Sequence, residues 1–242
     1  MTIKENIQEL QDRLKYSGFW ETLNKDLEKQ IKAKKSDFEL NMTKDLRDKK
    51  LGYGLHFRKS DEGRYYYNGF DARLSTPEGK EVSQRFYQNQ GITAKEALNL
   101  LEGRSVFKSL FSKEGERYNA WLQLDLGIRD EKGQHPVIQY HQNYGFKLED
   151  AVKEFPLKDL KYPDRLDLLL YSLKKGNRHE VEIEGNDSKF LLEANPRYKT
   201  LNIYDGEGKR MKYNVMKAAQ DLVEAEAKKN PQTKNRSKGV KV

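Results

Sequence analysis

The sequence predicts an α+β protein with an N-terminal helical hairpin, repeated antiparallel strand-plus-helix units and a disordered basic C-terminal tail. Three observations predict this class. Apolar residues follow helical spacing up to residue 34, and apolar and polar residues alternate from Leu51 onward. The block Gln88-Asn89-Gln90-Gly91 recurs 54 residues later as Gln142-Asn143-Tyr144-Gly145.

The composition indicates a folded chain with a modest core and a heavily charged surface. Of the 242 residues, 36% are hydrophobic and 35% are charged, and the mean hydropathy is -1.00. The 14 Tyr, 10 Phe and 2 Trp are nevertheless more aromatic side chains than a disordered chain carries. The absence of cysteine excludes a disulfide framework, a thiolate metal site and a cysteine nucleophile. Because the sequence has no signal-peptide pattern and no apolar run of ~20 residues, we expect a cytoplasmic protein with no membrane partner.

The first two helices follow from two apolar stripes. The stripe that begins at Ile3 is interrupted at Gly18, and a second stripe begins at Phe19. Further along, Thr93 and Glu96 form a capping-box signature for a helix that ends at Gly103. Alternation predicts strands over residues 37–42, 51–57, 65–74 and 82–88.

A second copy of the strand-and-helix pattern follows. Glu114-Gly115 before Tyr118-Asn119 echoes Glu62-Gly63 before Tyr67-Asn68, and a helix over 148–155 follows the second Asn-x-Gly block. A looser third echo, with strands over 180–184, 189–193 and 200–204, precedes a last helix over 215–228. The predicted segments are a helical hairpin (1–36), repeat 1 (37–102), repeat 2 (103–175), a partial repeat 3 with the last helix (176–227) and the tail (228–242).

The excess positive charge belongs to the tail. The formal net charge is +8, and residues 228–242 contain six Lys or Arg and no Asp or Glu. Six of the eight excess charges therefore lie there, which leaves +2 for residues 1–227. This distribution favours a nearly neutral folded body and a tail that adds nonspecific affinity for anionic partners.

Four groups of residues resemble a bacterial family. They are residues 92–97 with 100–104, residues 118–125, residues 141–146, and residues 193–200 with Tyr204-Asp205. They resemble a domain of unknown function found in proteins of bacterial conjugative and mobilisable elements, often encoded near topoisomerase and mobilisation genes. The resemblance covers roughly residues 85–210. It implies a setting of DNA handling, and it carries over no catalytic residues because none is established for the family.

The residues predict no enzyme, no cofactor and no metal site. A nucleophile elbow, a P-loop and a dinucleotide-binding motif are absent, and the four histidines lack zinc-ligand spacing. Pro163-Asp164 with Asp187-Ser188-Lys189 is similar to the carboxylate pair of Mg²⁺ nucleases. A first helical turn at Pro163 and a hairpin turn at Asp187 explain the same residues structurally, and this context favours the structural interpretation.

Two strands offer a better candidate site. Alternation places Arg85 and Tyr87 opposite Phe86, and His141 opposite Tyr140. If the opposite residues are core, the exposed rings and cations suit a nucleic-acid strand. The alternative, in which Tyr87 and His141 pack under a helix, stays open because aromatic residues in sheets are usually core. The predicted nucleic-acid-binding residues are Arg85, Tyr87, His141, Arg104, Lys108, Arg197, Lys199, Lys228, Lys229, Lys234, Arg236, Lys238 and Lys241.

We therefore expect a non-enzymatic nucleic-acid-binding accessory protein of a mobile genetic element, with single- or double-stranded DNA or RNA as its partner. The alternative is a protein–protein interaction module that docks to DNA-processing machinery, such as a mobilisation or topoisomerase protein. The near-neutral charge of residues 1–227 fits this alternative at least as well.

Overall fold

The computed structural model describes residues 2–184 and 188–212 and confirms the α+β class, with antiparallel sheets and short helices. It divides into two compact units, Met1–Gly145 with Lys174–Gly176, and Phe146–Leu173 with Asn177–Val242. The predicted last helix (215–228) and basic tail (228–242) lie outside the described residues. No helix in the described part is long and apolar enough to cross a membrane.

The described part of the first unit has three complete α-helices and two antiparallel sheets, of order β1-β2-β3-β4 and β5-β6-β7. The helices are α1 (Ile3–Tyr16), α2 (Asn24–Lys32) and α3 (Ala94–Leu101). The strands of the larger sheet are β1 (Asp37–Leu46), β2 (Lys49–Lys59), β3 (Tyr65–Ser75) and β4 (Glu81–Tyr87). Those of the smaller sheet are β5 (Val106–Phe111), β6 (Arg117–Leu124) and β7 (Val137–His141).

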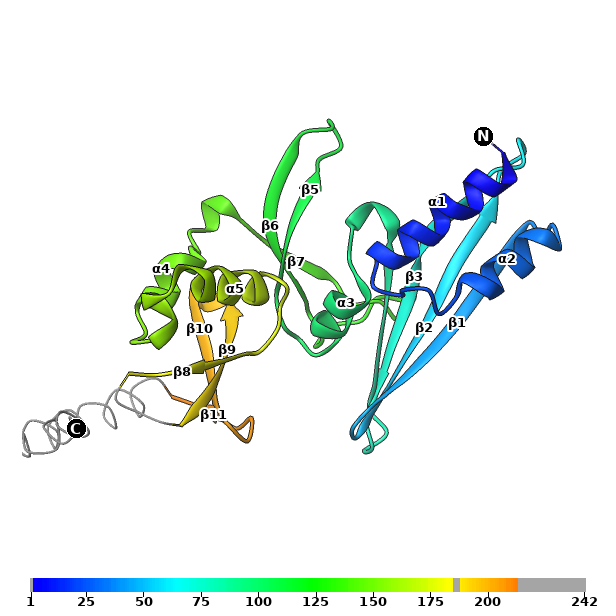
Figure 1. Ribbon diagram of the computed structural model, residues 1–242. Helices are drawn as coiled ribbons and strands as arrows, with labels where there is room; N and C mark the ends of the chain where they lie inside the picture. The colour runs from blue at the N-terminus through cyan, green and yellow to red at the C-terminus, as the bar shows by residue number, and fades with distance from the viewer. Residues whose placement is uncertain (1, 185–187, 213–242) are drawn as a thin grey trace, which may run out of the picture. The chain divides into compact units, whose positions relative to one another are not determined.

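One continuous core holds the first unit together. Helices α1 and α2 lie along one face of the larger sheet (Figure 1), where Leu14 and Leu27 pack with strand residues such as Phe70. The same core continues through Ala97 of α3 to Leu122 of the smaller sheet. The predicted boundaries 36/37 and 102/103 therefore do not separate compact units, because the apolar faces on either side of each boundary cover one another.

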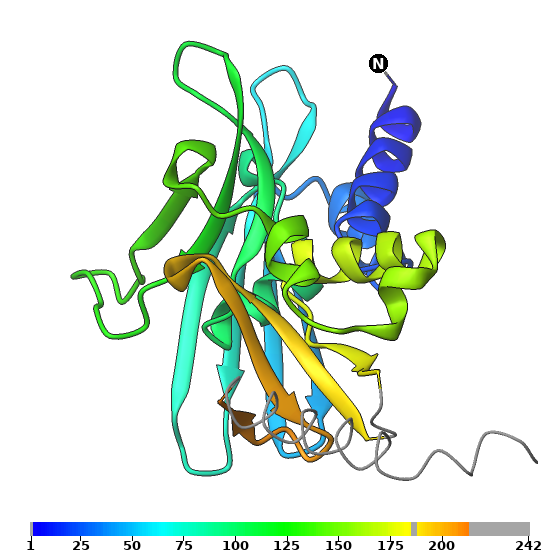
Figure 2. The same cartoon turned by 90° about the vertical axis from the view of Figure 1, so that its left-hand side faces the viewer.

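The second unit packs helices against a third antiparallel sheet, of order β11-β10-β9-β8, and Figure 2 shows the β9–β10 pair lying side by side. The helices are α4 (Leu148–Lys153), α5 (Pro163–Lys174), and the 3-10 helices η3 (Lys158–Lys161) and η4 (Pro196–Tyr198). The strands are β8 (His179–Glu182), β9 (Lys189–Asn195), β10 (Thr200–Asp205) and β11 (Arg210–Met211). The turn between the last two strands is closed by the hydrogen bond from the Gly208 amide to the Asp205 carbonyl.

The two Asn-x-Gly blocks form matching junctions. Strand β4 continues into the 3-10 helix η1 (Gln88–Gln90) and then α3, and β7 continues into η2 (Gln142–Tyr144) and then α4. Gly91 and Gly145 end these turns with φ of +61° and +86°, a conformation that glycine adopts without strain. The preceding sheets differ in strand number, and the second junction is where the chain passes between the two units. The structure therefore shows the recurrence at the junctions and not across whole units.

Candidate functional site

The alternation predicted for β4 and β7 is present. Phe86 and Tyr140 are buried, whereas Tyr87 is 57% exposed and His141 is exposed. The interpretation in which Tyr87 packs under a helix is therefore wrong. His141 is on the smaller sheet, where its ring lies 5.3 Å from that of Tyr118.

Tyr87 borders a groove that forms where β4 ends. Strand β4 pairs with β3 only as far as Gly69, opposite Tyr87. Gly69 cannot be replaced there without strain, because its φ is +129° and an added Cβ would lie 2.2 Å from the Phe86 carbonyl oxygen. Beyond this point β4 turns into η1, held by the hydrogen bond from the Tyr87 amide to Gln90. The remaining residues of β3, 65–68, have no strand partner on this side among the described residues.

Helix α1 closes the groove from the other side. The buried Asn6 side chain takes the place of a paired strand, because it accepts a hydrogen bond from the Tyr65 amide at 2.7 Å and donates one to its carbonyl at 3.0 Å. The groove between α1 and the β4–η1 junction encloses about 770 Å³. It is lined by Glu9, Leu10, Arg13, His56, residues 65–68, Arg85 and residues 87–90.

Two exposed tyrosine rings on this groove each have a guanidinium group against them. The Arg64 guanidinium lies 5.1 Å from the centroid of Tyr66, and that of Arg85 lies 6.0 Å from the centroid of Tyr87. The two rings are 44% and 57% exposed. A third exposed ring, Tyr16, lines a smaller adjoining pocket that shares Tyr87 with the groove. Exposed aromatic rings beside cations are the features on which unpaired bases stack.

The groove has a small positive charge. Glu9 binds Arg13 at 3.0 Å and Arg64 at 2.8 Å. Asp71 binds Arg85 at 3.3 Å and His56 at 2.7 Å. Three guanidinium groups thus share two carboxylates, which leaves one net positive charge. Each of these ion pairs occupies only part of the five N–H donors of a guanidinium group, so donors remain for an anionic ligand.

Comparison with protein-family models, curated proteins and solved structures finds no match. In the described part, no group of three or more His, Asp or Glu side chains is placed to hold a metal ion.

Lys108 was predicted as a nucleic-acid contact, but it belongs to a buried ion cluster instead. Its ammonium group lies 3.0 Å from Glu96 and donates to the Gly91 carbonyl, and its side chain is only 13% exposed. Lys175 binds the same carboxylate at 2.9 Å. Burial alone would raise the pKa of Glu96, but Lys108, the hydrogen bond from the Thr93 amide and Lys175 together lower it below its ordinary value of 4.5.

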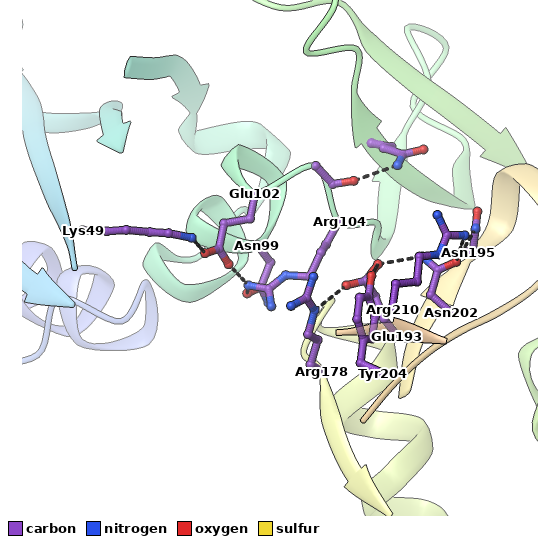
Figure 3. Close-up of polar contacts among 12 residues, drawn as sticks. Lys49, Asn99, Glu102, Arg104, Arg178, Glu193, Asn195, Asn202, Tyr204 and Arg210 are labelled. Atoms are coloured by element: carbon purple, nitrogen blue, oxygen red, sulfur yellow. Dashed lines mark hydrogen bonds and ion pairs between the residues drawn. The ribbon is translucent and has the colours of Figure 1, made fainter. Parts of the chain in front are cut away.

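Arg104 was also predicted as a nucleic-acid contact, but the structure buries it. Its side chain is buried, donates to Asn99 at 2.6 Å and pairs with Glu102, which also binds Lys49 at 2.8 Å (Figure 3). A cation that already balances a neighbouring carboxylate inside the protein has little left to offer a phosphate.

The other predicted residues are distributed over the chain. Arg197 and Lys199 are exposed on the second unit, on either side of the exposed Tyr198. The tail residues Lys228, Lys229, Lys234, Arg236, Lys238 and Lys241 lie outside the described residues. Of the predicted residues that the structure describes, only Arg85 and Tyr87 lie together in the groove.

Several groove residues were not predicted from the sequence, although a local pattern could have indicated one of them. Tyr66 lies between two residues of the same strand, Tyr65 and Tyr67, that are both buried, so alternation would have placed it outside. Glu9 and Arg13 had no such signal, because helical residues reach the groove only through the packing of α1 beside β3.

Proposed function

We propose that this chain is a non-enzymatic nucleic-acid-binding accessory protein and that the groove of the first unit binds a single strand. The observation that carries the proposal is the pair of exposed rings, Tyr66 and Tyr87, each beside an arginine on the same groove. Unpaired bases can stack on such rings, whereas a duplex hides its base faces. Action within a bacterial mobile element is part of the proposal and is supported by the sequence resemblance, and a cytoplasmic location is proposed with it.

Replacing Tyr87 with alanine is expected to weaken the binding of a fluorescein-labelled single-stranded oligonucleotide by roughly 5- to 150-fold, the equivalent of about 1–3 kcal/mol for one stacked base. Tyr66→Ala should behave similarly. Fluorescence anisotropy measures both effects. The matched control is Tyr162→Ala, because Tyr162 is a 53% exposed tyrosine with Arg165 4.9 Å from its ring, and it lies on the second unit. Equal affinity for the Tyr87 variant, the Tyr162 variant and the unaltered chain would contradict the proposal.

Deleting residues 228–242 is expected to lower nucleic-acid affinity and to flatten its salt dependence. Each phosphate that a Lys or Arg neutralises contributes roughly −0.7 to −0.9 to the slope of log affinity against log salt. The deleted segment contains six basic residues and no acidic ones, whereas the groove has one net positive charge. A salt titration of the intact and shortened chains on one oligonucleotide measures the slopes. Equal slopes would show that the tail makes no phosphate contacts.

The alternative, a protein-interaction module for DNA-processing machinery, is favoured by a second feature of the first unit. Helices α1 and α2 form a groove of about 650 Å³ with apolar residues Ile3, Ile7 and Ile31 and a basic rim that includes Lys4 and Lys34. Such a groove fits the apolar face of an amphipathic helix that also carries acidic residues. An intact chain that binds no oligonucleotide even at low salt would favour this alternative.

The finer fold prediction also stays a proposal. We infer that segments 37–102 and 103–175 are copies of one strand-plus-helix unit. Their matching junctions at Gly91 and Gly145 support this, as do the similar hairpin turns at Gly63 and Gly115. A Cα superposition of the two segments tests it.

A further inference from the structure

The second unit has a polar cleft of its own, of about 690 Å³, at the β9–η4–β10 corner and the short strand β11. Its polar lining consists of Asn195, Tyr198, Thr200, Asn202, Arg210 and Lys212. This cleft lies on a different unit from the groove described above, so the inference below goes beyond the proposed function.

The buried carboxylate of Glu193 holds the cleft residue Asn202 in position. Glu193 accepts hydrogen bonds from Arg178 at 2.9 Å, Asn202 at 2.8 Å and the Tyr204 hydroxyl at 3.2 Å (Figure 3). Its side chain is only 8% exposed, and the adjacent Arg178 balances its charge. The acidic group therefore holds the wall in position and presents little negative charge to the cleft.

Asn202 connects Glu193 to Arg210, one of the two cations of the cleft. Because its amide nitrogen donates to Glu193, its oxygen points the other way and accepts hydrogen bonds from Asn195 and Arg210, both at 2.8 Å. Arg210 is thus held by a neutral amide oxygen. No carboxylate of the described residues lies within ion-pair distance of its guanidinium group, so its charge is not neutralised there.

The residues that line the cleft include two cations and no carboxylate. Arg210 and Lys212 supply the positive charge, and Thr200 and Asn195 add neutral hydrogen-bond donors. Planar guanidinium groups with remaining N–H donors recognise phosphate oxygens through paired, charge-assisted hydrogen bonds. We propose that this cleft is a phosphate-binding site. The phosphate could belong to the backbone of a nucleic-acid strand or to a small phosphorylated molecule.

Calorimetric titration of the full chain with two probes tests this proposal. Pyrophosphate represents a small phosphorylated molecule, and a short abasic deoxyribose-phosphate oligomer represents the backbone. The oligomer has no bases to stack on Tyr66 or Tyr87, so base stacking in the groove does not contribute to its binding. Arg210→Gln is expected to weaken the binding of the recognised probe at least tenfold, about the value of one charge-assisted hydrogen bond. Arg165→Gln is the matched control, because Arg165 is exposed on the same unit outside the cleft.

The outcomes separate clearly. A loss of pyrophosphate binding alone in the Arg210→Gln variant assigns the site to small phosphorylated molecules, and a loss of oligomer binding alone in this variant assigns it to the backbone. The proposal fails if neither probe binds, or if Arg210→Gln and Arg165→Gln weaken binding equally. Should Arg210→Gln lower the unfolding temperature, Lys212→Gln replaces it, because Lys212 makes no hydrogen bond or ion pair with another described residue.

Discussion

Replacing Glu96 with glutamine is expected to lower the free energy of unfolding by about 3–5 kcal/mol, because it removes the carboxylate from a buried ion cluster and leaves the ammonium group of Lys108 without its counter-charge. The Glu96 side chain is 1% exposed and binds Lys108 at 3.0 Å and Lys175 at 2.9 Å. It also accepts the Thr93 amide hydrogen bond that completes the N-terminal cap of α3. The cluster therefore joins α3, β5 and residues 174–176 within the first unit.

Urea unfolding followed by circular dichroism measures this loss. Glu116→Gln is the matched control, because Glu116 is an exposed glutamate at a hairpin of the same unit. The lowered pKa of Glu96 adds a pH signature. Its stabilisation is present above its ordinary pKa of 4.5 and is lost as the pH falls through the lower folded-state pKa, so the variant should lose part of the acid dependence of stability. Unfolding curves that coincide for both variants and the unaltered chain would show that the cluster contributes no net stability.

Replacing Trp121 with alanine is expected to cost about 3–5 kcal/mol, because it deletes a large buried ring and leaves a cavity. Trp121 is 4% exposed in the central strand of the smaller sheet, and its ring centroid lies 5.4 Å from that of Phe107. Its neighbours across the strands are Phe107 and Tyr140. A loss of this size is a large part of the stability of a typical domain.

The other tryptophan supplies the control for this experiment. Trp20 is 65% exposed, so Trp20→Ala removes the same side chain with little loss of packing. Urea midpoints for the two variants, measured by circular dichroism, should differ widely. A Trp121 variant that unfolds at the same urea concentration as the Trp20 variant would show that the buried ring contributes little.

Local patterns were enough to predict most of the secondary structure. The capping box at Thr93 and Glu96 is present with both of its hydrogen bonds, and the strand that contains Phe86 alternates as expected. These signals were readable because a cap, a turn or a period of two is decided by residues only a few positions apart. The burial of Phe86 fits the same alternation.

The positions of two buried cations could not be predicted from local patterns. Lys108 and Arg104 were predicted as nucleic-acid contacts, yet both lie inside ion clusters. The partners of Glu96 include Lys175, 79 positions along the chain, and no local pattern predicts a contact at that separation.

The sequence by itself predicted the α+β class, the two N-terminal helices, the four strands of the larger sheet and the face on which Tyr87 lies. Only the tertiary structure decided that α1 closes a groove over the end of β3, through Asn6 and Tyr65, 59 positions apart. It also decided which cations keep donors for a ligand and which neutralise a buried carboxylate. The physical reason is that secondary structure depends on neighbouring residues, whereas a groove or an ion cluster exists only after distant segments have packed together.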